Sequence, residues 1–364
     1  MKIKAAVVRK KGGPFIIEEL ELDDPRQDEV LVRMAASGLC HTDLAGRDQL
    51  LPMAHTGVFG HEGAGVVEKV GSNVKNVRPG DHVVMSYLCC GVCPACRRGA
   101  PGLCVDFFPL NFSGARADGS VTMRKGNEKI HGSFFGQSSF ANYTLPTDRN
   151  VVKVSKDLPL ELLGPFGCGI QTGAGGVINS LKASPGTSIA IFGVGSVGVS
   201  AILGAVVSGC ATIIAVDVHP KRLTGAKGFG ATHTVNSAKT DPVQAIQKIT
   251  GGGVDYSLEC TGIPKVMRQA FDALAKGGTA GLIGSAPPDA DVALNMQALL
   301  NGRHVVGIVE GDCVSSIFIP QLLDLYKAGR FPFEGMIRTY PFEKINEAVE
   351  DSEKGKTLKA VLRF

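Results

Sequence analysis

Half of the cysteines in this chain are crowded into one short segment. Of the ten, five lie there: Cys89, Cys90, Cys93, Cys96 and Cys104. The last four follow the pattern C-x2-C-x2-C-x7-C, in which four thiolates can surround a tetrahedral ion such as zinc. A site closed by four protein ligands is structural, because it leaves no position open for a substrate. We therefore predict a structural zinc at these four cysteines, with Cys89 as a bystander.

Other uses of clustered cysteines are weaker alternatives. Closely spaced cysteines also bind iron–sulfur clusters, and a reduced, metal-free loop is the simplest possibility. A disulfide scaffold is disfavoured because the N-terminal segment MKIKAAVVRKKGG has no apolar stretch typical of a secretion signal. Zinc is the ion that this spacing favours.

Three further segments carry residues that can ligate a metal. They are Cys40–His41–Thr42–Asp43, Gly60–His61–Glu62–Gly63 and Gly167–Cys168–Gly169. A catalytic zinc takes three protein ligands and keeps one open position, and two cysteines with one histidine form a known set. Taken singly, each cysteine is more often an inert buried thiol, and the histidine a hydrogen-bonded turn residue. Spacing alone does not choose between these interpretations.

A glycine-rich segment indicates a nucleotide site. Gly193–Gly198 reads GVGSVG, follows the apolar run Ser188–Phe192 and opens a helix of small residues. The next β-branched run ends in Asp217, at the spacing that a dinucleotide-binding fingerprint requires. A plain strand–turn–helix with no ligand is the alternative, and the three agreeing contexts disfavour it.

Each residue of this fingerprint has a physical role. Gly193 permits a tight turn, Gly195 lets the backbone approach a pyrophosphate, and Gly198 lets helix and strand pack closely. Asp217 is expected to accept hydrogen bonds from the adenosine ribose and to repel a 2′-phosphate, which favours NAD over NADP. Arg222 lies nearby and alone suggests NADP, but the acid outweighs it.

The elements that must position these residues change in character along the chain. The first 150 or so residues read as β-rich, with short runs such as Ala5–Val8 and His82–Met85, and Asn111–Gly136 reads as loop. From about Gln171, apolar strands alternate with helical patterns, which predicts a parallel, doubly wound sheet. The segment Ser188–Val216 has no charged residue and is long enough to suggest a membrane span. Two buried parallel strands with a helix between them account for the same composition.

Composition agrees with a folded, soluble, two-domain protein. The chain has 364 residues, 44% of them hydrophobic and 20% charged, with a formal net charge of only +4. The cluster Arg9–Lys10–Lys11 is too short for a nucleic-acid patch. We therefore expect no nucleic-acid partner, no membrane segment and a cytoplasmic location.

Taken together and in this order, the motifs resemble the zinc-containing medium-chain alcohol dehydrogenase family. The matching segments are GLCHTDL, GHEGAGVVEKVG, CCGVCPACRRGAPGLC, GCGIQTG, GVGSVG and the tail FEKINEA…GKTLKAVLRF. The resemblance spans the whole chain. Within the family, NFSGARADG…FFGQSSFANYTL followed by ELLGPFGCGIQTGAG is most similar to the aryl (benzyl) alcohol dehydrogenases.

The resemblance implies a fold and a division of the chain. It implies a GroES-like β-rich catalytic domain (1–169, with a zinc lobe at about 87–110), a Rossmann nucleotide domain (170–309) and a return to the catalytic domain (310–364). It also implies a homodimer or homotetramer.

The resemblance further implies roles for individual residues. Cys40, His61 and Cys168 are expected to hold the catalytic zinc, with Glu62 close behind the metal and Asp43 orienting His61. Thr42 takes the hydroxyl position of a proton relay. The remaining implied cofactor contacts are His41 and Lys359 near the pyrophosphate, and Thr172 and Val197 near the nicotinamide.

One position departs from the family pattern. Many relatives have a histidine at the solvent end of the relay, where this chain has Ala45. We predict that the proton leaves through the ribose hydroxyl and water, helped by His41.

The sequence therefore predicts two zinc ions per chain and NAD-linked, reversible oxidation of primary aryl or allylic alcohols to aldehydes. An NADH-dependent aldehyde reductase with the same residues is the main alternative. A non-catalytic binding relative is a further one, which the intact candidate ligands disfavour.

Overall fold

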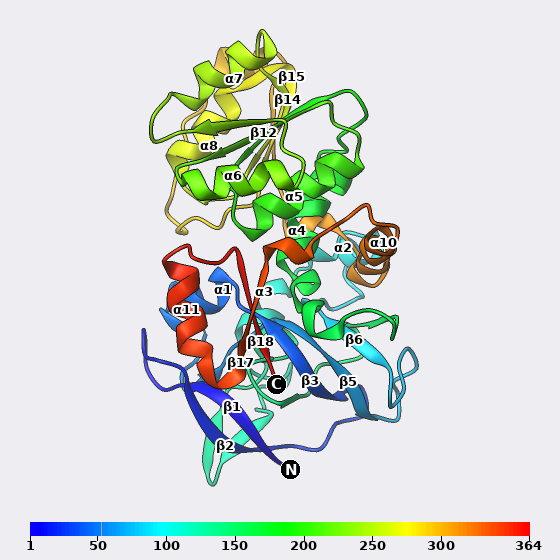
Figure 1. Ribbon diagram of the computed structural model, residues 1–364. Helices are drawn as coiled ribbons and strands as arrows, with labels where there is room; N and C mark the ends of the chain where they lie inside the picture. Colours follow the sequence, from blue (N-terminus) through cyan, green and yellow to red (C-terminus); the bar gives the residue numbers. More distant parts are fainter. Residues whose placement is uncertain (52) are drawn as a thin grey trace. The chain divides into compact units, whose positions relative to one another are not determined.

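The computed structural model describes residues 1–51 and 53–364, and the chain forms two compact units. The first unit contains Met1–Cys168, Val314–Gln321 and Glu334–Phe364. The second contains Gly169–Cys313 and Leu322–Phe333. Figure 1 shows β1 to β10 and the C-terminal β17 and β18 within the first unit.

The first unit is built on two sheets. One has five strands in the order β4-β1-β2-β7-β8, and the other has seven, in the order β10-β6-β5-β3-β18-β17 with β9 paired to β3. The strands are β1 (Lys2–Val8), β2 (Ile16–Leu22), β3 (Val30–Gly38), β4 (Gly57–Val58), β5 (Glu62–Val70), β6 (His82–Met85), β7 (Met123–Lys125), β8 (Glu128–Ile130), β9 (Tyr143–Thr144), β10 (Val151–Val154), β17 (Ile337–Pro341) and β18 (Lys359–Arg363).

The C-terminal strand is central to the second of these sheets. Strand β18 pairs antiparallel with β3, where Val361 faces Gly38, and parallel with β17. This pairing brings the start of β18 beside the start of β5 and the end of β3, where several candidate site residues lie. The core around these strands is apolar and fully buried, as at Val361 and Leu362.

Short helices connect the strands of the first unit. They are α1 (His41–Arg47), α2 (Pro94–Arg97), α3 (Phe107–Phe112) and α11 (Ile345–Glu353), with the single turns η1 (Pro101–Leu103), η2 (Phe134–Gly136), η3 (Leu160–Leu162), η4 (Gly164–Gly167), η7 (Glu334–Met336) and η8 (Phe342–Lys344). Helix α10 (Ser315–Lys327) has residues in both units.

The prediction that Asn111–Gly136 is loop is wrong. This stretch holds the hairpin of β7 and β8, which extends the five-stranded sheet through β2. Its strands are three residues long and mostly polar. They therefore lack the alternation of apolar and polar residues by which a strand is recognised in a sequence.

The second unit has one parallel sheet in the order β13-β12-β11-β14-β15-β16. Numbered from β11, this is the order 3-2-1-4-5-6 of the Rossmann fold. The strands are β11 (Ser188–Phe192), β12 (Thr212–Asp217), β13 (His233–Asn236), β14 (Val254–Glu259), β15 (Leu274–Leu282) and β16 (His304–Gly307). The predicted doubly wound parallel sheet is confirmed.

The helices of the second unit are α4 (Gly169–Gly175), α5 (Ser196–Val207), α6 (Pro220–Gly228), α7 (Pro242–Thr250), α8 (Pro264–Asp272) and α9 (Met296–Leu300), with the turns η5 (Gly176–Ser180) and η6 (Glu310–Asp312). Helices α5, α6, α7 and α8 pack against this sheet, and α4 packs on α5 (Figure 1). Among the described residues, no helix has the length and apolar character needed to cross a bilayer. The charge-free stretch Ser188–Val216 divides into β11, α5 and most of β12.

Candidate active site and metal centres

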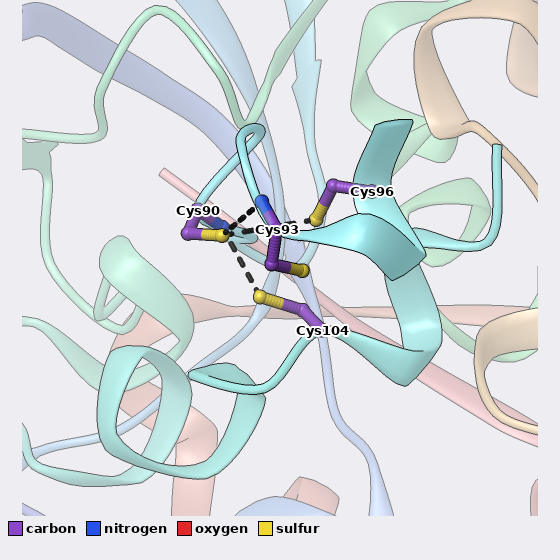
Figure 2. A group of neighbouring side chains, drawn as sticks. All are labelled: Cys90, Cys93, Cys96 and Cys104. Carbon is purple, nitrogen blue, oxygen red and sulfur yellow. Dashed lines mark hydrogen bonds between the residues drawn. The ribbon is translucent and has the colours of Figure 1, made fainter. Parts of the chain in front are cut away.

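The predicted structural cysteines converge on one point. The sulfur atoms of Cys90, Cys93, Cys96 and Cys104 all lie within 4.8 Å of one another, around the short helix α2 (Figure 2). Backbone N–H groups donate to these sulfurs, from Cys93 to Cys90 Sγ and from Cys90 to Cys104 Sγ, both at 3.3 Å. Backbone donors from Cys96 and Val105 lower the pKa of Cys93 to about 6, whereas burial raises the pKa of Cys96 to about 11 and that of Cys104 to about 12, so a bound cation is needed to keep all four as thiolates. The set fits a tetrahedral zinc, which takes thiolates stabilised by peptide N–H groups.

The scattered candidates also meet in space. One ligand atom each from Cys40, His61, Glu62 and Cys168 lies within 4.8 Å of the others. Cys40 precedes α1, His61 directly precedes β5, and Cys168 follows the turn η4. The sequence places these residues far apart, and the sheet pairing of β3 with β5 and the contact of η4 with β5 gather them.

The buried imidazole of His61 gives direct evidence that this cluster binds a metal ion. His61 is fully buried, and its Nε2 has no hydrogen-bond partner among the described residues. A buried polar atom without a partner is costly. A metal ligated by Nε2, Cys40 and Cys168 would satisfy it with the donor set of a catalytic zinc.

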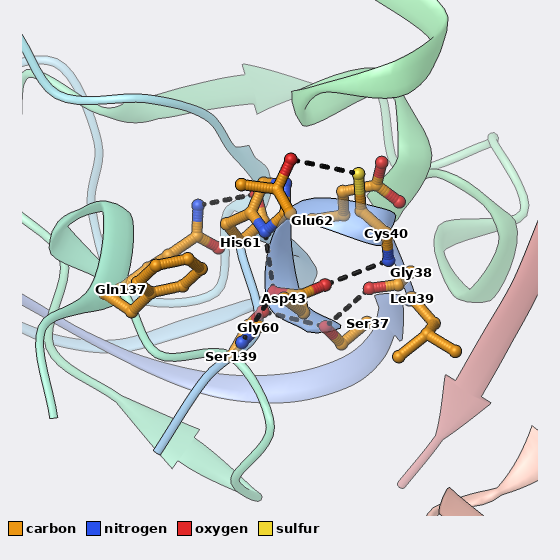
Figure 3. Close-up of polar contacts among 12 residues, drawn as sticks. Ser37, Gly38, Leu39, Cys40, Asp43, Gly60, His61, Glu62, Gln137 and Ser139 are labelled. Atoms are coloured by element: carbon orange, nitrogen blue, oxygen red, sulfur yellow. Dashed lines mark hydrogen bonds and ion pairs between the residues drawn. The ribbon is translucent and has the colours of Figure 1, made fainter. Parts of the chain in front are cut away.

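Asp43 holds this cluster from behind. Its Oδ1 lies 2.7 Å from His61 Nδ1 and accepts from the Gly60 N–H at 3.0 Å, while Oδ2 accepts from the Cys40 N–H at 2.9 Å (Figure 3). A carboxylate at Nδ1 keeps the proton there and directs the Nε2 lone pair outward. Asp43 is fully buried and so is fixed in place.

The charges in the cluster favour the metal-binding forms of the cysteines. The pKa of Cys40 lies well below its ordinary value, chiefly because of the hydrogen bond from Cys168 and then because of His61. Burial opposes a charge on His61, but Asp43 and Cys40 together outweigh it, and the pKa of His61 lies well above its ordinary value. The cluster therefore stabilises a thiolate next to a strong donor site.

Lys359 forms a buried ion pair with Glu62, at the metal-binding cluster. Its ammonium donates to both carboxylate oxygens of Glu62, at 2.8 and 2.9 Å, and to the Leu39 carbonyl at 3.1 Å. These bonds occupy the three N–H donors of the ammonium, and Lys359 is 2% exposed. The structure thus gives Lys359 a role in pairing Glu62, and its expected contact with a pyrophosphate stays a prediction. Burial raises the pKa of Glu62, and Lys359 opposes that rise most strongly.

The predicted relay residues lie on α1. Thr42 Oγ1 is 3.7 Å from Cys40 Sγ, so the hydroxyl lies beside a metal ligand. His41 is exposed at the first position of the helix, and Ala45 is partly buried one turn further on. The role of His41 toward a cofactor stays a prediction.

The glycine turn has the geometry that a dinucleotide site needs. Gly193 has φ +87°, a left-handed conformation that glycine adopts without strain. A Cβ at Gly198 would lie 2.0 Å from the Gly193 carbonyl oxygen, whereas a Cβ at Gly195 would meet no atom within 4 Å. Gly198 therefore serves packing, and the surface at Gly195 is open for a ligand.

The remaining cofactor candidates surround this turn within the second unit. Asp217 ends β12, where its carboxylate accepts from the Val194 and His219 N–H groups at 2.8 Å each, and Arg222 lies 3.8 Å away. Thr172 lies on α4 and donates to Glu310 at 3.3 Å. Val197 lies in the first turn of α5. Glu310 was not predicted, and nothing in its sequence context points to it.

Aromatic residues near the four-cysteine segment differ in exposure. Tyr87 is buried against Phe107 with ring centroids 5.7 Å apart, which agrees with a core role, whereas Phe108 is 62% exposed. The aromatic side chains beside His61 are instead Phe134 and Phe135, which were not singled out as site residues. A pair of adjacent phenylalanines before a glycine was the available signal.

The fold and the two metal-binding clusters define a zinc-binding dehydrogenase. Two family models match the chain, the alcohol dehydrogenase GroES-like domain over residues 26–156 and the zinc-binding dehydrogenase domain over residues 196–328. The chain is 46% identical to a geraniol dehydrogenase of Castellaniella defragrans over 364 residues, covering 99% of this chain and 97% of that protein. The chain thus belongs to the zinc-containing medium-chain alcohol dehydrogenase family.

Solved structures agree with this assignment. An alcohol dehydrogenase zinc-binding domain protein from Burkholderia ambifaria is 52% identical with a TM-score of 0.99, covering 100% of this chain and 99% of that one. A benzyl alcohol dehydrogenase from Acinetobacter calcoaceticus is 46% identical with a TM-score of 0.97, at the same coverage. The similarity extends over both units, and the GroES-like and Rossmann assignments follow from it.

Proposed function

We propose that this enzyme catalyses the reversible oxidation of primary aryl or allylic alcohols to aldehydes with NAD⁺ as hydride acceptor. The observation that carries the proposal is the cluster of Cys40, His61, Glu62 and Cys168, in which His61 Nε2 has no hydrogen-bond partner among the residues that the structure describes. The substrate class is supported by the relatives, which are named for geraniol and for benzyl alcohol.

The chemistry divides between the bound groups and the chain. A zinc ion held by Cys40, His61 and Cys168 would supply the Lewis acidity that makes an alcohol hydroxyl acidic, and NAD⁺ would supply the hydride acceptor. Thr42, beside Cys40, is placed to accept the hydroxyl proton and pass it on. Asp43 fixes His61 and the Cys40 backbone, so the ligands need not rearrange during turnover.

The choice of NAD over NADP rests on Asp217. Its carboxylate is buried at the end of β12 and is held by two backbone N–H groups next to the glycine turn. A fixed negative charge at this place repels a 2′-phosphate and accepts from a ribose hydroxyl. Arg222 lies within reach of this carboxylate, which offsets its attraction for a phosphate.

The test is a spectrophotometric assay of the zinc-loaded enzyme. We expect NADH formation with benzyl alcohol and geraniol at a kcat/KM far above that for ethanol, and little reaction with NADP⁺. The variant Cys168→Ser is the negative control, because it removes one proposed ligand and leaves the glycine turn intact. Absence of turnover with any alcohol, in protein shown to hold two zinc ions, would reject the proposed substrate class. Equal rates with NADP⁺ would reject the role of Asp217.

A further inference from the structure

The His61 imidazole lies between two phenylalanine rings from a single turn. The ring of Phe135 stacks on its face, with centroids 4.5 Å apart and an interplanar angle of 28°. The ring of Phe134 meets it edge-on, at 5.6 Å and 83°. Both phenylalanines belong to η2 and are buried, so these contacts exclude water from the imidazole.

The backbone at Phe135 is held in an unfavourable conformation. Its φ and ψ are +51° and +34°, the left-handed region that costs a bulky residue of order 1 kcal/mol. Such a conformation persists only where the surroundings fix it. Here the ring of Phe112, from α3, meets the Phe135 ring edge-on at 5.1 Å, and Phe134 does so at 5.0 Å. The residue with the strained backbone is therefore the one whose ring stacks on His61.

The same turn also holds the backbone of His61. Gln137 Nε2 donates to the His61 carbonyl at 2.9 Å (Figure 3). Its Oε1 accepts from the Gly63 N–H at 3.1 Å. Ser138 Oγ accepts from the Phe134 N–H at 2.8 Å and donates to the Val58 carbonyl at 2.6 Å. The turn is thus anchored on both sides of the segment that carries His61.

These contacts complete the orientation of the imidazole. The imidazole can rotate about its Cβ–Cγ bond, and the hydrogen bond between Nδ1 and Asp43 restrains this rotation at one atom. A ring stacked on its face restrains the same rotation over the whole imidazole, because turning it separates the two faces or drives them together. The direction of Nε2 toward Cys40 and Cys168 is then set by two contacts of different kinds.

We propose that Phe135 is a positioning residue that presets the imidazole plane of His61 for metal binding. The inference rests on the proposed function, in which His61 is a zinc ligand. This role predicts an effect on metal binding that ordinary core packing does not predict. Loss of the stacked face weakens metal retention at Cys40, His61, Glu62 and Cys168 (the Cys40 cluster). It leaves metal retention at Cys90, Cys93, Cys96 and Cys104 (the Cys90 cluster) unaffected.

The test measures metal release and the spectrum of cobalt-substituted protein. Phe135→Leu removes the aromatic face at similar bulk, and Phe135→Tyr keeps it. Phe15→Leu is the matched control, since Phe15 is 3% exposed like Phe135, shares its hydrophobic cluster and packs on Phe59 and Phe140. The zinc of the Cys90 cluster serves as an internal reference in every sample.

We expect Phe135→Leu to release one of two zinc ions to a chelator about tenfold faster than wild type, the scale seen when a group orienting a ligand is lost. The d–d bands of the cobalt at that site shift in Phe135→Leu and return in Phe135→Tyr. Unchanged release and an unchanged spectrum in Phe135→Leu would overturn the inference, as would an equal effect of Phe15→Leu. A wild-type chain that binds only one zinc would instead reject the proposed function, and this inference with it.

Discussion

At the scale of single residues, the ion pair of Lys359 and Glu62 is almost completely buried, with side chains 2% and 0% exposed. Removing one partner of such a pair leaves a charge without compensation, which costs about 3–5 kcal/mol. We expect Lys359→Met to lose about that much stability and Lys359→Met/Glu62→Gln to recover most of it. Lys69→Met, which breaks the exposed pair with Asp24 (side chains 59% and 90% exposed), is the control and should cost about 1 kcal/mol or less.

The loss in Lys359→Met also depends on pH. Lys359 is the main influence that lowers the pKa of Glu62 against burial, so the variant has a still higher Glu62 pKa when folded than when unfolded. The folded variant then binds the extra proton, and its stability falls as pH rises from the unfolded value toward the folded one. Urea unfolding at pH 5 and pH 8 measures this. A loss that is equal at both values would contradict the uncompensated carboxylate.

The alanine at position 45 leads to a second prediction at this scale. It lies one turn beyond Thr42 on α1, and no imidazole stands there to take the proton onward. Ala45→His introduces a base with an ordinary pKa near 6.5. We expect hydride transfer to rise by about tenfold or less above pH 7, with the gain vanishing below about pH 6, where the imidazole is protonated. Ala45→Gln is the control, and stopped-flow measurement of NADH formation gives the profile. The same pH profile in all three proteins would reject this relay.

At the scale of elements, two glycines of the turn between β11 and α5 differ in what a methyl group would meet. At Gly198 the Cβ would lie 2.0 Å from a carbonyl oxygen, and at Gly195 it would lie in open space. We expect Gly198→Ala to cost about 1–3 kcal/mol through forced backbone shifts. Gly195→Ala should change stability by about 0.5 kcal/mol at most, yet weaken NADH binding at least about tenfold because the backbone can no longer approach the pyrophosphate. Urea unfolding and NADH fluorescence titration separate the two effects. Normal NADH affinity in Gly195→Ala would exclude this turn as the cofactor site.

An element could be predicted where consecutive residues carry its pattern, and was missed where it depends on a distant partner. Strands β6 and β11 have the predicted bounds because they are apolar runs closed by turn residues. The β7–β8 hairpin was missed because its residues are polar and its partner, β2, is distant in the sequence. The four-cysteine cluster could be predicted from local spacing. Grouping Cys40, His61 and Cys168 required the family resemblance, because three-dimensional packing alone brings them together. The contact of Lys359 with Glu62 has no local sequence pattern, and the adjacent phenylalanines before Gly136 are the only local sign of the contact of Phe135 with His61.

At the scale of the whole molecule, the open edge of the parallel sheet bears on the predicted assembly. Among the described residues, β16 pairs only with β15, so its other edge is free. Beside that edge the surface is apolar, with Val305 38% and Leu300 79% exposed. A free strand edge with exposed apolar side chains favours pairing with another strand. We propose that a second copy of this chain covers it, as a homodimer or as part of a homotetramer.

The assembly is tested by a charge placed at this edge. Val305→Asp buries an unpaired carboxylate in the proposed interface, which costs about 3 kcal/mol and weakens association by roughly a hundredfold. Val206→Asp, at a residue 43% exposed on α5, is the matched control and should leave association unchanged. Light scattering at micromolar concentration measures the mass against the 38.1 kDa monomer. A monomeric wild type would reject the assembly, and an oligomer that tolerates Val305→Asp would place the interface elsewhere. Dissociation in Val305→Asp alone, with both zinc ions retained, would show that the sheet edge joins the subunits and that the metal sites form within one chain.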